Sequence, residues 1–108
     1  MTQHDFSALF SHYPELINQM PDLFTSHEFI LQLARQHQTL YIRALYAYRD
    51  LPDTQNPTPF KTVHGILAKH LNAYPNLVTN IGEVDSFDIF TNENTCVQWQ
   101  KRVTLGSR

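Results

Sequence analysis

Apolar residues recur at spacings of three and four over residues 26–49, the longest regular pattern in the chain. This spacing places apolar side chains on one face of an α-helix and leaves the opposite face to polar ones. The pattern begins directly after Thr25, and Glu28 completes the spacing of a capping box, in which each side chain bonds the other residue's backbone N–H. The chain therefore predicts one long amphipathic helix over residues 26–49. Its apolar stripe comprises Ile30, Leu33, His37, Leu40, Tyr41, Ala44, Leu45 and Tyr48.

A second amphipathic helix is predicted over residues 59–73, after a polar, proline-containing loop at residues 50–58. Thr58 suits the N-cap, and Pro59 suits the first helical position, where the missing N–H of proline costs no hydrogen bond. Gly65 lies inside this helix, where glycine is about 1 kcal/mol less favourable than alanine. We therefore expect another backbone to pack closely against Gly65. The apolar stripe of this helix is formed by Phe60, Val63, Leu67 and Leu71.

Shorter elements are predicted on either side of these helices. Residues 1–24 contain two apolar clusters interrupted by Pro14 and Pro21, which indicates two short helical segments. Residues 77–90 contain two β-prone runs separated by Gly82, and glycine suits the tight connection of a β-hairpin. A small β element is therefore expected over residues 77–90.

The segment at residues 95–103 fits two patterns. With the period of two of a strand, Val97, Trp99, Val103 and Leu105 lie on one face, with Lys101 as the exception. With the period of 3.6 of a helix, Cys96, Trp99 and Val103 form one stripe. We favour a short helix here, followed by a frayed tail over residues 104–108.

These elements predict a single domain over residues 1–108, of a mainly helical α+β class with a small β-hairpin after its second main helix. A chain of this length is close to the commonest domain size, and its apolar content of 42% is sufficient for one buried core.

Composition narrows the class of protein further. Cys96 is the single cysteine, so the chain forms no internal disulfide and fits a reducing compartment. The first residues show no basic segment followed by an apolar run, and nowhere do about eighteen apolar residues occur in succession. We therefore expect a cytoplasmic location and no membrane partner.

Residue spacing gives little support for catalysis or metal binding. The six histidines form no helical pair three or four residues apart. In the helix interpretation Cys96 falls in a first turn, where helix N-termini favour a thiolate, but a free cysteine is more often a small buried hydrophobe. The three glycines form no phosphate-binding loop. We therefore expect no catalytic residue, no metal site and no cofactor, and we expect that the protein is not an enzyme.

The order of the elements resembles that of a winged-helix DNA-binding domain. The resemblance covers about residues 26–90 and lies in two helices followed by a β-hairpin, with a loop at 50–58 that is longer than the turn of a simple helix-turn-helix. It implies a binding module in which the second helix lies near DNA and cations close to the C-terminus lie near phosphates. The implied residues are Lys61, His64, Lys69 and His70 on the helix, and Lys101 and Arg102 near phosphates.

The charge distribution limits the strength of such binding. The formal net charge is −2; residues 1–58 carry three positive and six negative side chains, whereas residues 59–108 carry five positive and four negative ones. Because so few cations provide a weak attraction for phosphates, tight binding is expected to need a dimer or a second protein.

A protein-interaction or oligomerisation module with no nucleic-acid binding is the alternative. Tyrosine and phenylalanine are frequent anchors at interfaces. Tyr46 lies off the main apolar stripe, so its exposure would favour this alternative. Two sets of aromatic residues are candidates for such a surface: Phe6, Phe10 and Tyr13, or Tyr41, Tyr46 and Tyr48.

Overall fold

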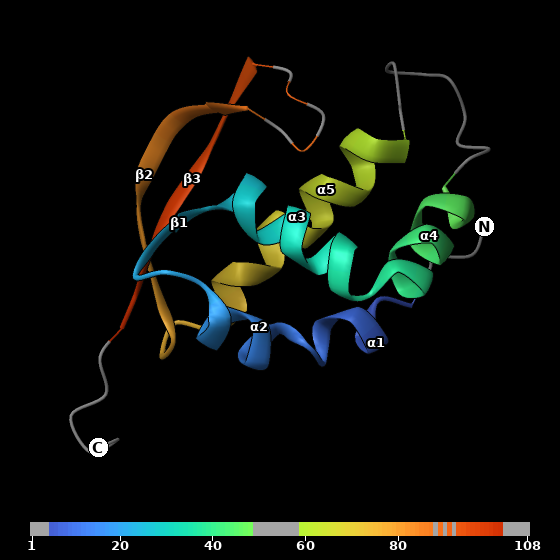
Figure 1. Cartoon of the computed structure of the whole chain (residues 1–108), viewed down its shortest axis with the longest axis horizontal. Helices are drawn as coiled ribbons and strands as arrows, with labels where there is room; N and C mark the ends of the chain where they lie inside the picture. Colours follow the sequence, from blue (N-terminus) through green and yellow to red (C-terminus); the bar gives the residue numbers. More distant parts are fainter. Residues whose placement is uncertain (1–4, 49–58, 88, 90, 92, 103–108) are drawn as a thin grey trace.

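A computed structural model of the chain describes residues 5–48, 59–87, 89, 91 and 93–102. Within these residues, helices pack beside a three-stranded antiparallel sheet, which is an α+β arrangement (Figure 1). The predicted loop at 50–58 and the predicted tail at 104–108 lie outside the described residues. The elements are α1 (Ser7–Phe10), α2 (Tyr13–Gln19), β1 (Leu23–Thr25), α3 (Ser26–Gln36), α4 (Gln38–Ala47), α5 (Pro59–His70), the 3₁₀ helix η1 (Leu71–Ala73), β2 (Val78–Phe87) and β3 (Glu93–Lys101).

The sheet has the strand order β1-β3-β2 and lies at one end of the molecule (Figure 1). β3 is the central strand, since it pairs with β2 along its length and with β1 only over residues 98–100. Phe24 of β1 lies opposite Trp99 of β3, and both side chains are buried. One face of the sheet is therefore closed by aromatic side chains that join the core.

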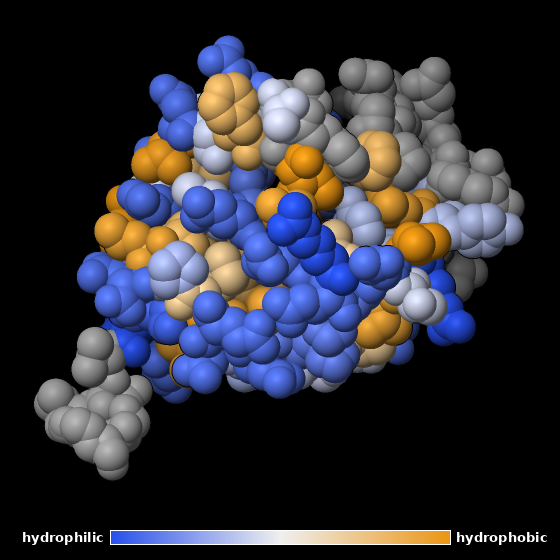
Figure 2. Space-filling model, in the orientation of Figure 1, coloured by the Kyte–Doolittle hydropathy of each residue, from blue (hydrophilic) through white to orange (hydrophobic). Residues whose placement is uncertain are grey.

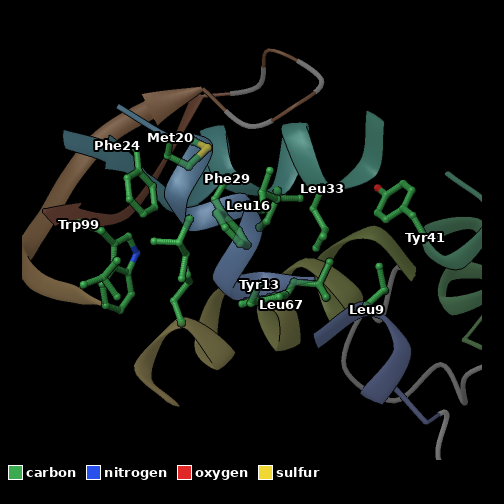
Figure 3. Packing of buried hydrophobic residues seen from close by; sticks show 14 of the residues in the cluster. Leu9, Tyr13, Leu16, Met20, Phe24, Phe29, Leu33, Tyr41, Leu67 and Trp99 are labelled. Carbon is green, nitrogen blue, oxygen red and sulfur yellow. The ribbon is translucent and has the colours of Figure 1, made fainter. Parts of the chain in front are cut away.

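The core connects the sheet with the helices (Figure 3). It extends from Trp99 and Phe24 at the sheet, through Phe29 and Leu16, to Tyr41 among the helices. The aromatic rings within it make close contacts, for example between Tyr13 and Phe29, whose ring centroids are 4.8 Å apart. Side chains from α1 through β3 thus share one cluster of buried residues.

One buried hydrogen bond fixes α2 against α5. The Tyr13 hydroxyl donates to the carbonyl oxygen of Leu67 at 2.7 Å, and both side chains are fully buried. Burial, with a smaller contribution from Tyr74, raises the pKa of Tyr13, so the hydroxyl keeps its proton and remains a donor.

Several local predictions are confirmed. Two short helices, α1 and α2, occupy the N-terminal segment, and α5 begins at Pro59. Both bonds of the capping box are present: the Thr25 N–H donates to Glu28 Oε1 at 2.8 Å, and the Glu28 N–H donates to Thr25 Oγ1 at 3.1 Å. The sequence did not reveal β1, because a strand of three residues is too short to show a period.

The predicted single helix over residues 26–49 is wrong, because the chain leaves helical geometry at His37, with φ −130° and ψ 57°. The backbone bonds continue on both sides: the His37 N–H donates to the Leu33 carbonyl at 2.9 Å, and its own carbonyl accepts from the Tyr41 N–H at 3.0 Å. The apolar spacing also continues across the break, which is why the sequence concealed it. The break separates α3 from α4, and α4 packs against both α1 and α5.

The predicted hairpin around Gly82 is wrong in its pairing. Residues on both sides of Gly82 belong to one strand, β2, whose partner is β3. Gly82 has a φ of 114° and lies where the pairing register shifts between Asn80 and Glu83. Its conformational freedom therefore serves an irregularity within the strand, as in a β-bulge.

The favoured helix over residues 95–103 is also wrong, because this segment contributes to β3. A period of two and a period of 3.6 both place Trp99 on one face with Val103. Only the pairing with β1 and β2 therefore decides between strand and helix. Cys96 consequently lies half-buried within a strand and not in the first turn of a helix.

Candidate functional site

A groove with a volume of about 630 Å³ opens between α5, the start of α3 and the first half of β3. The residues that line it come from α3 (Ser26, His27 and Ile30), from α5 and η1 (Phe60, Lys61, His64, Gly65, Ala68, Lys69 and Asn72) and from β3 (Asn94, Thr95, Cys96, Val97 and Trp99).

The wall of the groove formed by α5 is basic at both ends and open in the middle. Lys61 and Lys69 are exposed and lie two turns apart, and the sequence of α5 contains no acidic residue. Between them the wall contains His64, Gly65, which has no side chain, and Ala68, whose side chain is small. Two cationic groups therefore flank a stretch of the wall that holds small residues.

The predicted close packing at Gly65 is wrong, since apart from its chain neighbours and the backbone of its own helix no atom lies within 4 Å of the position that a Cβ would take there. Replacing Gly65 by alanine is therefore expected to raise the free energy of unfolding by about 1 kcal/mol. Thermal unfolding followed by circular dichroism should show a midpoint about 4–8 °C higher than that of the wild type.

Gly82→Ala is the matched control for that substitution. At a φ of 114° an added Cβ strains the backbone, so the same chemical change should lower the midpoint. A midpoint of Gly65→Ala at or below that of the wild type would contradict the open position of Gly65.

His64 forms the part of the groove nearest to α4. Its Nε2 lies 2.6 Å from the Tyr41 hydroxyl, and the ring of Phe60 lies 6.0 Å away between centroids. Burial raises the pKa of Tyr41 to about 12, so the hydroxyl stays protonated near neutral pH. This hydrogen bond links the position of α4 to the wall of the groove.

The structure places the other three predicted DNA-contacting residues away from the groove. The His70 ring stacks on Phe10, with centroids 3.5 Å apart, and burial lowers its pKa. The Lys101 Nζ donates to two carbonyl oxygens at the end of α2, those of Asn18 at 3.1 Å and Met20 at 2.8 Å. Arg102 donates from its guanidinium to Thr79 Oγ1 at 3.1 Å.

The β2–β3 hairpin carries the opposite charge from α5. Glu83, Asp85 and Glu93 are exposed along its two strands. A hollow beside the hairpin is lined by Asp85 and Glu93 together with Glu28 of α3. Electrostatic attraction for phosphate therefore comes from α5, whereas this part of the hairpin repels it.

Sequence reasoning missed the groove residues that come from β3 and from the start of α3. Asn72 lies three residues after Lys69, a helical spacing that would have revealed it. Asn94 and Thr95 carried no such signal, because their position follows from the strand register. His27 also lines the groove, and its buried Nδ1 has no hydrogen-bond partner among the described residues.

A metal site and a membrane span can also be assessed from the described residues. Within the described ranges, no three His, Cys, Asp or Glu side chains gather closely enough to hold a metal ion. Among the same residues, no helix has the length and apolar character needed to cross a bilayer. Comparison with known proteins finds no matching family model, no similar curated protein and no similar solved structure.

Proposed function

We propose that this protein is a small nucleic-acid-binding module in which α5 enters the major groove of duplex DNA. The observation that carries the proposal is the acid-free wall of α5, with Lys61 and Lys69 along an open groove. The two lysines lie eight positions apart along the helix, a rise of about 12 Å, which is comparable with the width of the major groove.

The order of elements around α5 supports the same function, provided that the acidic residues Glu83, Asp85 and Glu93 of the hairpin face away from the phosphates. α3 and α4 precede α5, the β2–β3 hairpin follows it, and the short β1 pairs with the hairpin to give the strand order β1-β3-β2. This order is similar to that of winged-helix domains, in which such a hairpin lies beside the helix that reads DNA. The proposal keeps the cytoplasmic location that the single cysteine suggested.

The strength of binding follows from the few cations in the groove. Lys61 and Lys69 together neutralise about two phosphates, so binding to random-sequence duplex is expected to be weak, with a dissociation constant of about 10 µM at low salt. Raising the salt concentration from about 50 to about 200 mM should weaken binding about tenfold.

Fluorescence anisotropy of a labelled random-sequence duplex, titrated with the protein, measures this dissociation constant and its dependence on salt. The double variant Lys61→Glu/Lys69→Glu should weaken binding more than tenfold, because it replaces both attractive charges with repulsive ones. Arg35→Glu/Arg43→Glu is the matched control, since it changes the net charge equally on exposed positions of α3 and α4, outside the groove.

Two outcomes would contradict the proposal. The first is no binding by the wild type at about 100 µM in low salt. The second is an equal loss in both double variants, which would show that total charge and not the face of α5 governs binding.

Protein interaction is the second candidate function, and exposed apolar side chains on α4 favour it. Ile42 is 59% exposed and Tyr46, one turn later, is 62% exposed. On the face drawn in Figure 2, however, hydrophilic residues divide the hydrophobic ones into separate patches. We therefore rank this candidate below DNA binding, and a failure of the anisotropy experiment would reverse the order.

A further inference from the structure

Two imidazole rings stack where the four N-terminal helices approach one another. His12 lies between α1 and α2, and His37 lies between α3 and α4. Their ring centroids are 3.7 Å apart and their planes differ by 17°. The stack therefore joins the α1–α2 connection to the residue at which the chain leaves helical geometry.

Two ionisable side chains of the described residues, His12 and Glu15, act on the His37 ring. Burial first and His12 second lower the pKa of His37, whereas Glu15 of α2 acts in the opposite direction. Arg35 stands in the last turn of α3, while α1 and the first turn of α4 contain no carboxylate and no basic side chain. The negative end of the α3 dipole and the positive end of the α4 dipole meet at His37 and oppose each other.

We propose that the stacked rings of His12 and His37 form a pH-sensitive joint that holds α4 in place and loosens when both rings are protonated. One protonated ring can stack on a neutral one, because a cation is attracted to the face of an aromatic ring. Two cations at 3.7 Å repel each other, and a single carboxylate, Glu15, balances only one of them.

Loosening at this joint reaches the groove through α4. Tyr41 lies one turn after His37 and is the residue whose hydroxyl contacts His64 of α5. Movement of α4 would therefore act on one end of the groove wall. The joint itself depends only on the histidine stack, so it stands or falls independently of DNA binding.

Histidine titration by NMR tests the pair directly. The variant His12→Phe keeps an aromatic ring against His37 but removes the second charge. The pKa of His37 should rise in this variant, because the second positive charge beside the ring is removed. In the wild type, the ring signal of His37 should shift in two steps, as expected of a site coupled to a neighbour.

The sign of the effect on stability follows from the lowered pKa of His37. As the pH falls, His37 binds a proton near pH 6.5 in the unfolded chain and only at a lower pH in the folded chain. The contribution of His37 to the free energy of unfolding is therefore fully present above about pH 6.5 and decreases as the pH falls below it. The amide signals of residues 38–41 should shift during the second protonation step. Both effects should be smaller in His12→Phe.

His70→Phe is the matched control, because His70 also stacks on an aromatic ring, that of Phe10, but belongs to the last turn of α5 and not to the pair of His12 and His37. It should leave the pKa of His37 unchanged. An equal His37 pKa in the wild type and in His12→Phe, or residue 38–41 amides that do not respond to the second step, would overturn the joint. Because the two-step titration is measured on the wild type, the proposal is testable even if a variant folds poorly.

Discussion

Replacing Phe29 by alanine is expected to lower the free energy of unfolding by about 3–5 kcal/mol. Phe29 is fully buried in α3 and contacts the rings of Tyr13 and Phe24, with centroid distances of 4.8 and 6.0 Å. The loss combines the transfer energy of the ring with the cavity left between α2, α3 and the sheet. A domain of this size has a total stability of only about 5–15 kcal/mol. The midpoint of thermal unfolding should therefore fall by about 15 °C or more.

Phe87→Ala is the matched control for that substitution. The side chain of Phe87 is 59% exposed in β2, so the same chemical change should cost less than about 1 kcal/mol. Urea unfolding of both variants gives the comparison. Equal losses for the two variants would show that the core lies elsewhere than in the contact between α3 and the sheet.

The second large effect is expected at the contact between Ser26 and Trp99. The indole Nε1–H of Trp99 donates to Ser26 Oγ at 2.9 Å, and both residues are buried. Ser26 also donates to the Val97 carbonyl, at 3.4 Å. Ser26→Ala leaves the indole N–H without its acceptor, so it should lower the free energy of unfolding by about 1–3 kcal/mol.

A double-mutant cycle with Trp99→Phe separates this bond from general packing. Once the indole N–H is absent, removing the serine hydroxyl should cost less, and the coupling energy should be at least about 1 kcal/mol. Ser11→Ala, at an exposed hydroxyl that donates to the Ala8 carbonyl, is the control and should cost less than about 0.5 kcal/mol. If the losses in the free energy of unfolding of Ser26→Ala and Trp99→Phe simply add in the double variant, the two side chains form no stabilising hydrogen bond.

The candidate site was anticipated only in part. The resemblance to winged-helix domains implied Lys61, His64, Lys69 and His70 as ligand-facing residues of the second helix, and the structure places the first three along the groove. His70 follows Lys69 directly, so its side chain turns about 100° around the helix, and it stacks on α1 instead. Lys101 was assigned to phosphates, yet its ammonium group caps the end of α2.

The sequence by itself determined the features that depend on neighbouring residues. The capping box at Thr25 and Glu28, the start of α5 at Pro59 and the division of the N-terminal segment each depend on bonds or dihedral angles within about four residues. These local rules gave the helices of the described residues apart from the break at His37, but they also favoured a helix over residues 95–103, where the structure has β3.

Only the tertiary structure decided the break at His37, the strand partners and the groove. The break occurs where His37 meets His12, a residue 25 positions earlier in the printed sequence, and α4 then packs on α1 and α5. The choice of strand for residues 95–101 depends on pairing with β1, and the Ser26–Trp99 bond spans 73 positions. A helix satisfies its backbone bonds within itself, whereas a strand and a groove need distant segments, so their residues acquire a structure only when those segments meet.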